Sequence, residues 1–151
     1  MATYSFQDVS ATLTGVGGVI NFGAGSGDTK EGITITMSQP RNSPTIGADG
    51  EYMHSLRADK SGTVTVRLLA TSPVNAQLQT LYAAQSLSSS AWGNNVIVIQ
   101  NRGNNEITTA RGCAFQKQPD RTYAEDGGYL EWVFDCGKID TITGTYTTTT
   151  A

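Results

Sequence analysis

Few residues in this sequence have a type and spacing that could support catalysis. His54 is the only histidine, and it is followed by Ser55 in a segment rich in Gly, Pro and charged residues. A histidine base that activates a nucleophile is normally oriented by a third group, often a carboxylate, and the surrounding sequence supplies no recognisable one. The order Gly-x-Ser-x-Gly of a nucleophile elbow is also absent. We therefore interpret His54 as a solvated or interface residue.

Cofactor-binding patterns are equally weak. Cys113, Cys136 and His54 do not occur at any standard zinc-ligand spacing. The stretch Gly23–Gly27 (GAGSG) resembles a phosphate loop only in its glycines, because the Lys-Ser/Thr pair of a P-loop is missing. The sequence predicts no zinc site and no nucleotide cofactor.

Two short acidic pairs could hold a cation in principle. Asp28 occurs with Glu31, and Asp49 with Glu51. Neither run has the density of oxygen ligands found in a calcium loop, so turns and solvated charges explain both. We expect no metal, no cofactor and no enzymatic activity.

Composition narrows the class of protein. The chain has 151 residues, which predicts a single domain over 1–151. Its net charge of −3 and pI of about 5.0 argue against a basic nucleic-acid-binding surface. The longest purely aliphatic run, Val96–Ile99, is far too short for a membrane span. Two cysteines are too few for a disulfide scaffold, which favours free thiols and synthesis in a cytoplasm.

The remaining residues predict a mainly β protein organised around one helix. Thr63–Leu69 alternates apolar and polar residues with the period of a half-buried strand. Ser72 and Pro73 then mark the start of a helix over about Val74–Leu87, with Ser72 as the expected N-cap. Further strands are expected at Tyr4–Thr14, Val19–Phe22, Ile33–Ser38, Val96–Gln100, Glu106–Ala110, Cys113–Lys117, Tyr129–Asp135 and Ile139–Gly144. Of these, Val96–Gln100 is apolar on both faces and should be a central, covered strand.

A long segment, Gln39–Lys60, has little periodicity and is expected to be a loop. It combines charges of both signs with large apolar residues that include Tyr52, Met53 and Leu56. Loops of this length in a compact domain are often functional. Either a neighbouring chain buries these side chains, or the loop folds back onto its own core; composition favours neither.

The chain resembles the tail tube proteins of contractile-tailed bacteriophages. The matching stretches cover most of the chain in order, and the match is weakest at Gln100–Thr109 and past Gly144. They are TYSFQDVSATLTG at Thr3–Gly15, EGITI at Glu31–Ile35, GADGEYMHS at Gly47–Ser55, KSGTVTVRLL at Lys60–Leu69, TSPVNAQL at Thr71–Leu78 and EWVFDC at Glu131–Cys136.

The resemblance implies a β-sandwich or small antiparallel barrel with one flanking helix. It implies a structural subunit of the virion tail, made in the host bacterial cytoplasm, that assembles into hexameric rings stacked as a hollow tube. DNA would pass through this tube without specific binding. The implied partners are further copies of the chain, the tail sheath, the baseplate, the tape measure and the tail terminator proteins. The fold is similar to the tubes of type VI secretion systems and phage-like bacteriocins, so a tube from one of those systems is an alternative.

Two sets of candidate site residues follow. The expected subunit-interface loop comprises Arg41, Gly47, Asp49, Gly50, Glu51, Tyr52, Met53, His54, Leu56, Arg57 and Lys60. The wall of the lumen should carry small polar side chains and be net acidic, because basic side chains would bind phosphates through counterion release. Strand faces opposite the core residues supply the lumen candidates Thr34, Thr36, Ser38, Thr63, Thr65, Glu131 and Asp135.

Arg67 shares the face of Thr63 and Thr65. Either it pairs with an acidic neighbour such as Glu131, or this face is not luminal. A different function class, a soluble β-sandwich binding module for carbohydrate, also stays open. Such modules expose aromatic platforms, and here Trp132 fits the core while Trp92 is a lone candidate platform.

Overall fold

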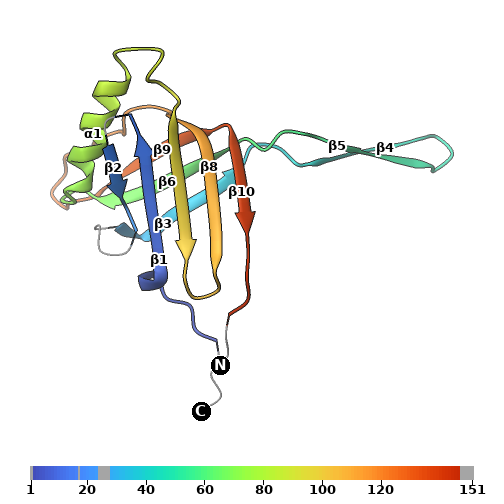
Figure 1. The fold of residues 1–151 in the computed structure, drawn as a ribbon, viewed down its shortest axis with the longest axis horizontal. Helices are drawn as coiled ribbons and strands as arrows, with labels where there is room; N and C mark the ends of the chain where they lie inside the picture. The colour runs from blue at the N-terminus through green and yellow to red at the C-terminus, as the bar shows by residue number, and fades with distance from the viewer. Residues whose placement is uncertain (1, 17, 24–27, 147–151) are drawn as a thin grey trace.

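The computed structural model describes residues 2–16, 18–23 and 28–146. Of the glycine-rich stretch Gly23–Gly27, only Gly23 lies within the described residues. After a short 3-10 helix at Phe6–Asp8, the elements in chain order are β1 Val9–Gly15, β2 Gly18–Asn21, β3 Asp28–Met37, β4 Asn42–Ile46, β5 Tyr52–Leu56, β6 Gly62–Leu69, α1 Val74–Gln85, β7 Asn95–Asn101, β8 Glu106–Phe115, β9 Tyr129–Cys136 and β10 Lys138–Ile142 (Figure 1).

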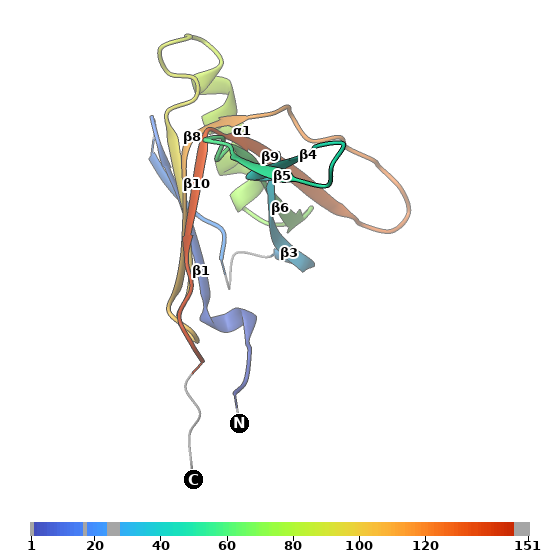
Figure 2. The same ribbon diagram turned by 90° about the vertical axis from the view of Figure 1, so that its right-hand side faces the viewer.

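The strands form two packed layers that share β8. The hydrogen-bonded order is β2-β1-β7-β8-β9-β6-β3, with β10 paired to β8, and all pairings are antiparallel. Most of β8 pairs with β7 and β10, whereas its last residues, Ala114 and Phe115, pair with β9. Figure 2 shows the β2-β1-β7-β8-β10 layer edge-on, with β9, β6 and β3 crossing beside it. The fold is therefore a mainly β sandwich with one flanking helix, as predicted, and the sheet does not close into a barrel.

Side chains from both layers meet in one core. The largest fully buried side chains include Trp132, Phe22 and Phe134. Phe115 lies between the layers, with its ring centroid 4.9 Å from that of Phe134 and 5.9 Å from that of Trp132. The alternation predicted for β6 is confirmed, because its burial pattern alternates strictly from Gly62 to Leu68. This alternation assigns one face of each strand to the core and leaves the other for contacts outside.

The helix packs on the core through one stripe of side chains. Val74, Leu78 and Leu81 are buried, and Tyr82 packs edge-on against Phe115. The helix begins at Val74, as predicted, but its N-cap and its C-terminal end differ from the prediction. Pro73 is the N-cap, while the hydroxyl of Ser72 accepts a hydrogen bond from the backbone amide of Val74 at 3.3 Å. The helix also ends at Gln85 rather than near residue 87.

A buried amide pair joins the end of the helix to β7. The side-chain amides of Gln85 and Asn95 donate to each other's carbonyl oxygens at 2.7 and 2.8 Å. Asn95 also donates to the backbone carbonyl of Cys113 at 3.1 Å. Both side chains are buried, so these hydrogen bonds replace those lost to water. A Cβ at Gly15 would collide with the Asn95 side chain, which explains a glycine at that point of β1.

The segment expected to be a long loop contains a β-hairpin instead. Strands β4 and β5 pair antiparallel from Asn42↔Leu56 to Ile46↔Tyr52, and the connecting turn includes Gly50 with a positive φ of 89°. Hydrophobic periodicity reveals a strand when one of its faces is buried on a core. Here nearly every residue of both strands is exposed, so the pattern that identifies the other strands is missing.

Two further strands differ from expectation. The predicted strands Glu106–Ala110 and Cys113–Lys117 form the single strand β8, which passes through Gly112 with a positive φ of 62°. Strand β7 is central, between β1 and β8, but it is covered on one face only. Ile97 is fully buried, whereas Val98 on the opposite face is half-buried because none of the described strands or helices is stacked on that face.

Candidate assembly surfaces

The hairpin β4–β5 projects away from the sandwich (Figure 1). Because side chains alternate across a strand, its register places Ile46, Tyr52 and Leu56 on one face. These side chains are 72%, 69% and 80% exposed. The hairpin therefore carries an apolar face that its own subunit does not cover, and exposed patches of this kind mark contact sites.

Polar contacts hold the hairpin at its base and its tip. At the base, the backbone amide of Arg57 donates to the carbonyl of Arg41 at 2.8 Å, and its guanidinium donates to the side-chain oxygen of Gln39. At the tip, the amide of Gly47 donates to the carbonyl of Glu51 at 2.7 Å, and the carboxylate of Asp49 accepts from the Glu51 amide at 3.2 Å. These bonds define where the hairpin begins and turns.

The structure brings most of the predicted interface residues into this one element. Tyr52 and Leu56 lie on the apolar face with His54, whose ring centroid is 5.3 Å from that of Tyr52. Met53 lies on the opposite face. The tip holds Gly47, Asp49, Gly50 and Glu51, and the base holds Arg41 and Arg57. Lys60 lies beyond the hairpin and forms an ion pair with Asp140 at 3.1 Å. The sequence reasoning missed Ile46, which pairs with Tyr52.

The predicted lumen residues also gather on one surface, the outer face of the β3-β6-β9 layer. Thr36 pairs with Thr63, which pairs with Asp135. Two residues along the strands, Thr34 pairs with Thr65, whose partner on β9 is Val133. Ser38 directly follows β3, and its amide donates to the carbonyl of Ser61 at 3.0 Å. Glu131 lies on β9, at the register position of Arg67. We call this surface the threonine face; it consists of Thr34, Thr36, Thr63, Thr65, Glu131 and Asp135, with Arg67 among them.

Arg67, the cation among the residues that define the threonine face, is paired with Glu131, which agrees with the first of the two alternatives above. Arg67 Nε lies 3.0 Å from Glu131 Oε2. Its guanidinium also lies over the ring of Tyr129, 5.2 Å from the centroid. Because Asp135 adds a second carboxylate, the residues named as the threonine face carry a net charge of −1. A phosphate approaching it meets small hydroxyls and a neutralised arginine.

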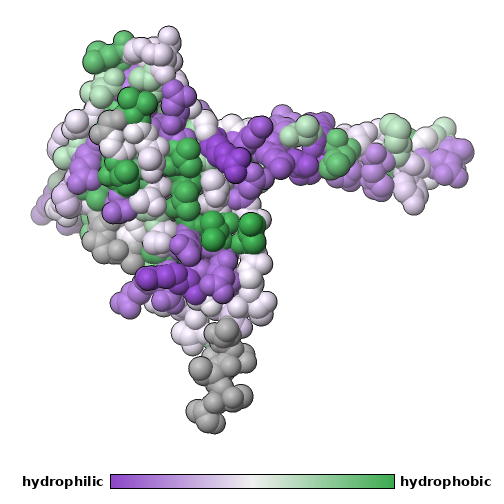
Figure 3. Space-filling model, viewed as in Figure 1, coloured by the Kyte–Doolittle hydropathy of each residue, from purple (hydrophilic) through white to green (hydrophobic). Residues whose placement is uncertain are grey.

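The outer face of the other layer has a different character. Val19 is 61% exposed, Ile107 37% and Ile142 73%, and Val96 and Val98 lie on this face between them. Figure 3 shows apolar side chains gathered over the centre of this layer. The sequence reasoning missed this surface because it expected β7 to be covered on both faces.

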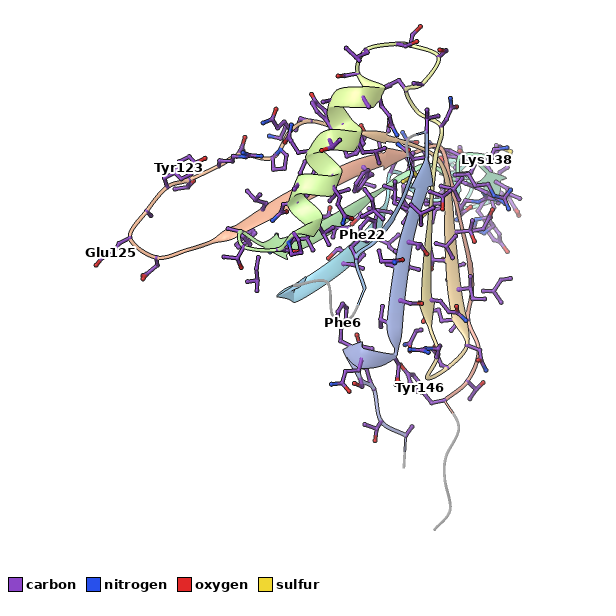
Figure 4. All side chains as sticks on the ribbon, turned by 60° about the vertical axis from the view of Figure 1, so that its left-hand side comes forward. Phe6, Phe22, Tyr123, Glu125, Lys138 and Tyr146 are labelled. Carbon is purple, nitrogen blue, oxygen red and sulfur yellow. The ribbon has the colours of Figure 1, made fainter. Side chains whose placement is uncertain are left out.

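A groove lies between α1 and the loop of residues 116–128. Its volume is about 990 Å³, and its lining includes Ala76, Gln79, Arg121, Tyr129 and Glu131. Arg121 donates to the side-chain oxygen of Gln79 at 3.1 Å, which ties the loop to the helix. Figure 4 shows the loop, with Tyr123 and Glu125, extending away from the sandwich beside α1. In Figure 1 this side of the molecule is opposite the hairpin.

The candidate chemical residues form no reactive centre. The Nδ1 of His54 lies 3.3 Å from the side-chain nitrogen of Asn42. In the part of the chain that the structure describes, no group of three or more His, Cys, Asp or Glu side chains could hold a metal ion. No helix there reaches the length and hydrophobicity that a membrane crossing needs. Trp92 is half-buried and packs against the rings of Tyr82 and Phe115 at the edge of the core.

These features define an antiparallel β-sandwich with one flanking helix and a projecting apolar hairpin. A family model described as "Bacteriophage PhiTE tail tube protein" matches residues 1–144. The chain therefore belongs to this family of phage tail tube proteins, which are structural components of the tail. No curated protein matches the sequence.

Solved structures share the fold at low sequence identity. A chain of the extracellular contractile injection system PVC sheath-tube complex in its extended state matches with a TM-score of 0.56 and 9% identity, over 93% of this chain and 92% of that one. A chain of the PVC sheath/tube terminator matches with a TM-score of 0.58 and 11% identity, over 94% and 98%. A chain of the anti-feeding prophage baseplate, 6-fold symmetrised, matches with a TM-score of 0.50 and 11% identity, over 94% and 97%.

Proposed function

We propose that the protein assembles into hexameric rings that stack into the hollow tube of a contractile phage tail, through which DNA passes. The single observation that carries this proposal is the projecting hairpin with its uncovered apolar face. A monomer gains no burial from Ile46, Tyr52 and Leu56, whereas an adjacent copy that covers them gains roughly 1.5–3 kcal/mol for each side chain.

The geometry of the subunit supports contacts of the head-to-tail kind. The hairpin and the groove beside α1 lie on opposite sides of the molecule (Figure 1). Contacts between unlike surfaces on successive copies generate closed rings or stacks rather than isolated dimers. Strand β3 lies at one end of the strand order, and an edge strand presents backbone donors and acceptors to a partner. The sixfold symmetry of the similar baseplate assembly supports a hexamer.

The threonine face is the better candidate for the lumen. Small hydroxyls and a net negative charge allow DNA to slide, whereas each unpaired Lys or Arg would add affinity for phosphate. The opposite layer instead presents Val19, Ile107 and Ile142, which suit a contact buried against another chain. A hexamer of chains with a net charge of −3 would carry eighteen net negative charges.

The same proposal names the partners. The tube would contact a sheath along its outer surface, a baseplate at one end and a terminator at the other, with a tape measure inside during assembly. Similar chains occur in complexes described as sheath-tube, sheath/tube terminator and baseplate assemblies. Synthesis in the host bacterial cytoplasm would precede assembly into the tail.

Electron microscopy of the purified protein tests the assembly. We expect rings at low concentration and tubes at high concentration, with sixfold averages in end-on views. A strictly monomeric mass by light scattering over a wide concentration range would contradict the proposal. A variant lacking residues 47–55 should remain folded but fail to polymerise, because this deletion removes the hairpin tip and most of β5 while leaving the sandwich elements intact.

Thiol labelling of assembled tubes tests the lumen assignment. Thr34→Cys places a thiol on the threonine face, and Ser10→Cys places one on the outer face of the other layer; both positions are exposed in the subunit. In tubes, a small maleimide should reach Thr34→Cys, and a maleimide too bulky to enter the channel should not. Labelling of the isolated subunits by both reagents is the control. Exclusion of the bulky reagent from Ser10→Cys alone would assign the lumen to the opposite layer.

A further inference from the structure

The two cysteines, which are far apart in the sequence, meet inside the core. Cys113 is fully buried and Cys136 is 4% exposed, and both are free thiols. Their sulfur atoms lie 3.0 Å apart, with the thiol of Cys113 donating to the Sγ of Cys136. The pair lies where β8 passes from one layer to the other, next to Gly112 and the turn at Gly137.

The strand register makes this pair suitable for a covalent bond. Ala114 pairs with Asp135, so the next position along the two strands brings Cys113 opposite Cys136. The amide of Gln116 donates to the carbonyl of Val133, and hydrogen-bonded positions alternate along an antiparallel ladder. The cysteines therefore occupy a non-hydrogen-bonded position, where opposing side chains approach most closely. A disulfide needs this close approach of the two Cβ atoms.

The geometry points to an intramolecular disulfide between Cys113 and Cys136, which forms when the folded protein meets a disulfide oxidant. The sulfur of Cys136 attacks the oxidant as a thiolate, giving a mixed disulfide and releasing one thiol. The thiolate of Cys113 then attacks the Cys136 sulfur and releases the second thiol. Two cysteine thiols are oxidised, one oxidant disulfide is reduced to two thiols, and no other reactant is needed.

The assignment of the two roles has a structural basis. The hydrogen bond from Cys113 lowers the pKa of the Cys136 thiol, and the same hydrogen bond, with burial, raises the pKa of Cys113. Cys136 also retains the small exposed fraction of the pair and lies at the end of β9. It is therefore the residue that reacts first with a reagent in solution.

The bond would covalently cross-link strands β8 and β9. It would close the chain between Cys113 and Cys136, which contains the loop of residues 116–128 and strand β9. For a loop of roughly two dozen residues, the restriction of the unfolded chain should raise the melting temperature of a protein of this size by roughly 6–12 °C. A protein made with free thiols would become more stable after transfer to an oxidising medium.

Mass spectrometry of the full chain tests this inference without a variant. The purified protein is incubated with oxidised glutathione, with and without a low, non-denaturing concentration of urea that speeds local opening. It is then unfolded and alkylated. We expect the mass to fall by two hydrogen atoms, both thiols to resist alkylation, a peptide map to link the two cysteines, and dithiothreitol to reverse all three changes.

Several results would overturn the inference. Two alkylatable thiols after incubation in urea, a persistent glutathione adduct, or linked dimers as the main product would each show that the pair does not close. Cys136→Ser and Cys113→Ser should give no intramolecular product, which identifies the linkage. An oxidised protein with a melting temperature no higher than that of the reduced protein would refute the predicted stabilisation.

Discussion

Replacing Leu56 by alanine should weaken assembly without weakening the subunit. The side chain is 80% exposed on the apolar face of the hairpin, so nearly all of its surface is available to a partner. The substitution removes three carbons, and at about 0.8 kcal/mol for each buried CH2 it should cost about 2 kcal/mol per contact. Since 1.4 kcal/mol corresponds to a factor of ten, the critical concentration for assembly should rise about 30-fold.

Leu87 provides a matched control. This leucine is 87% exposed and follows the helix, away from the hairpin. Both alanine variants should unfold in urea within about 0.5 kcal/mol of the unmodified protein, because neither side chain is buried in the subunit. Sedimentation or light scattering over a dilution series gives the critical concentration. The reasoning would be refuted if Leu56→Ala assembled at the same critical concentration as the unmodified protein, or if Leu87→Ala raised the critical concentration by as much as Leu56→Ala.

Three further predictions concern dynamics, the buried amides and pH. A two-stranded hairpin is marginal alone, so amides of residues 42–56 should exchange quickly in the subunit and slowly in tubes; equal exchange in both states would show that the hairpin is not covered. Asn95→Ala removes both hydrogen bonds that join Asn95 to the buried amide of Gln85, which keeps only a 3.5 Å contact with the Val16 carbonyl. This change should lower the free energy of unfolding by roughly 1–3 kcal/mol in a urea titration. A loss below about 0.5 kcal/mol, which is typical of a surface substitution, would argue against a stabilising role for the pair. The hydrogen bond from Lys60 lowers the pKa of Asp140. The contribution of the Lys60–Asp140 pair to stability is therefore present above the ordinary aspartate pKa and is lost as the pH falls through the lowered pKa. In Lys60→Met, the pKa of Asp140 measured by NMR should move back toward the ordinary value, and an unchanged pKa would contradict this assignment.

The sequence alone determined the elements that bury one face on the core. The alternation at Thr63–Leu69 gave β6, and Val74, Leu78 and Leu81 at helical spacing gave α1, because burial imposes the period of the backbone on the residue pattern. The threonine face followed from the same rule, since the residues opposite the core of β3, β6 and β9 share one side of the layer. The resemblance to tail tube proteins was visible in stretches of residues that cover most of the chain.

Tertiary structure decided the features that depend on residues distant in the sequence or on exposure. The hairpin β4–β5 leaves no one-sided burial pattern, because nearly all of its residues face solvent in the subunit. The open outer face of β7 depended on whether a second layer covers it. The pairing of Cys113 with Cys136 required β8 to cross between the layers beside β9. Local periodicity reports what one segment buries, whereas the packing of segments determines which residues meet.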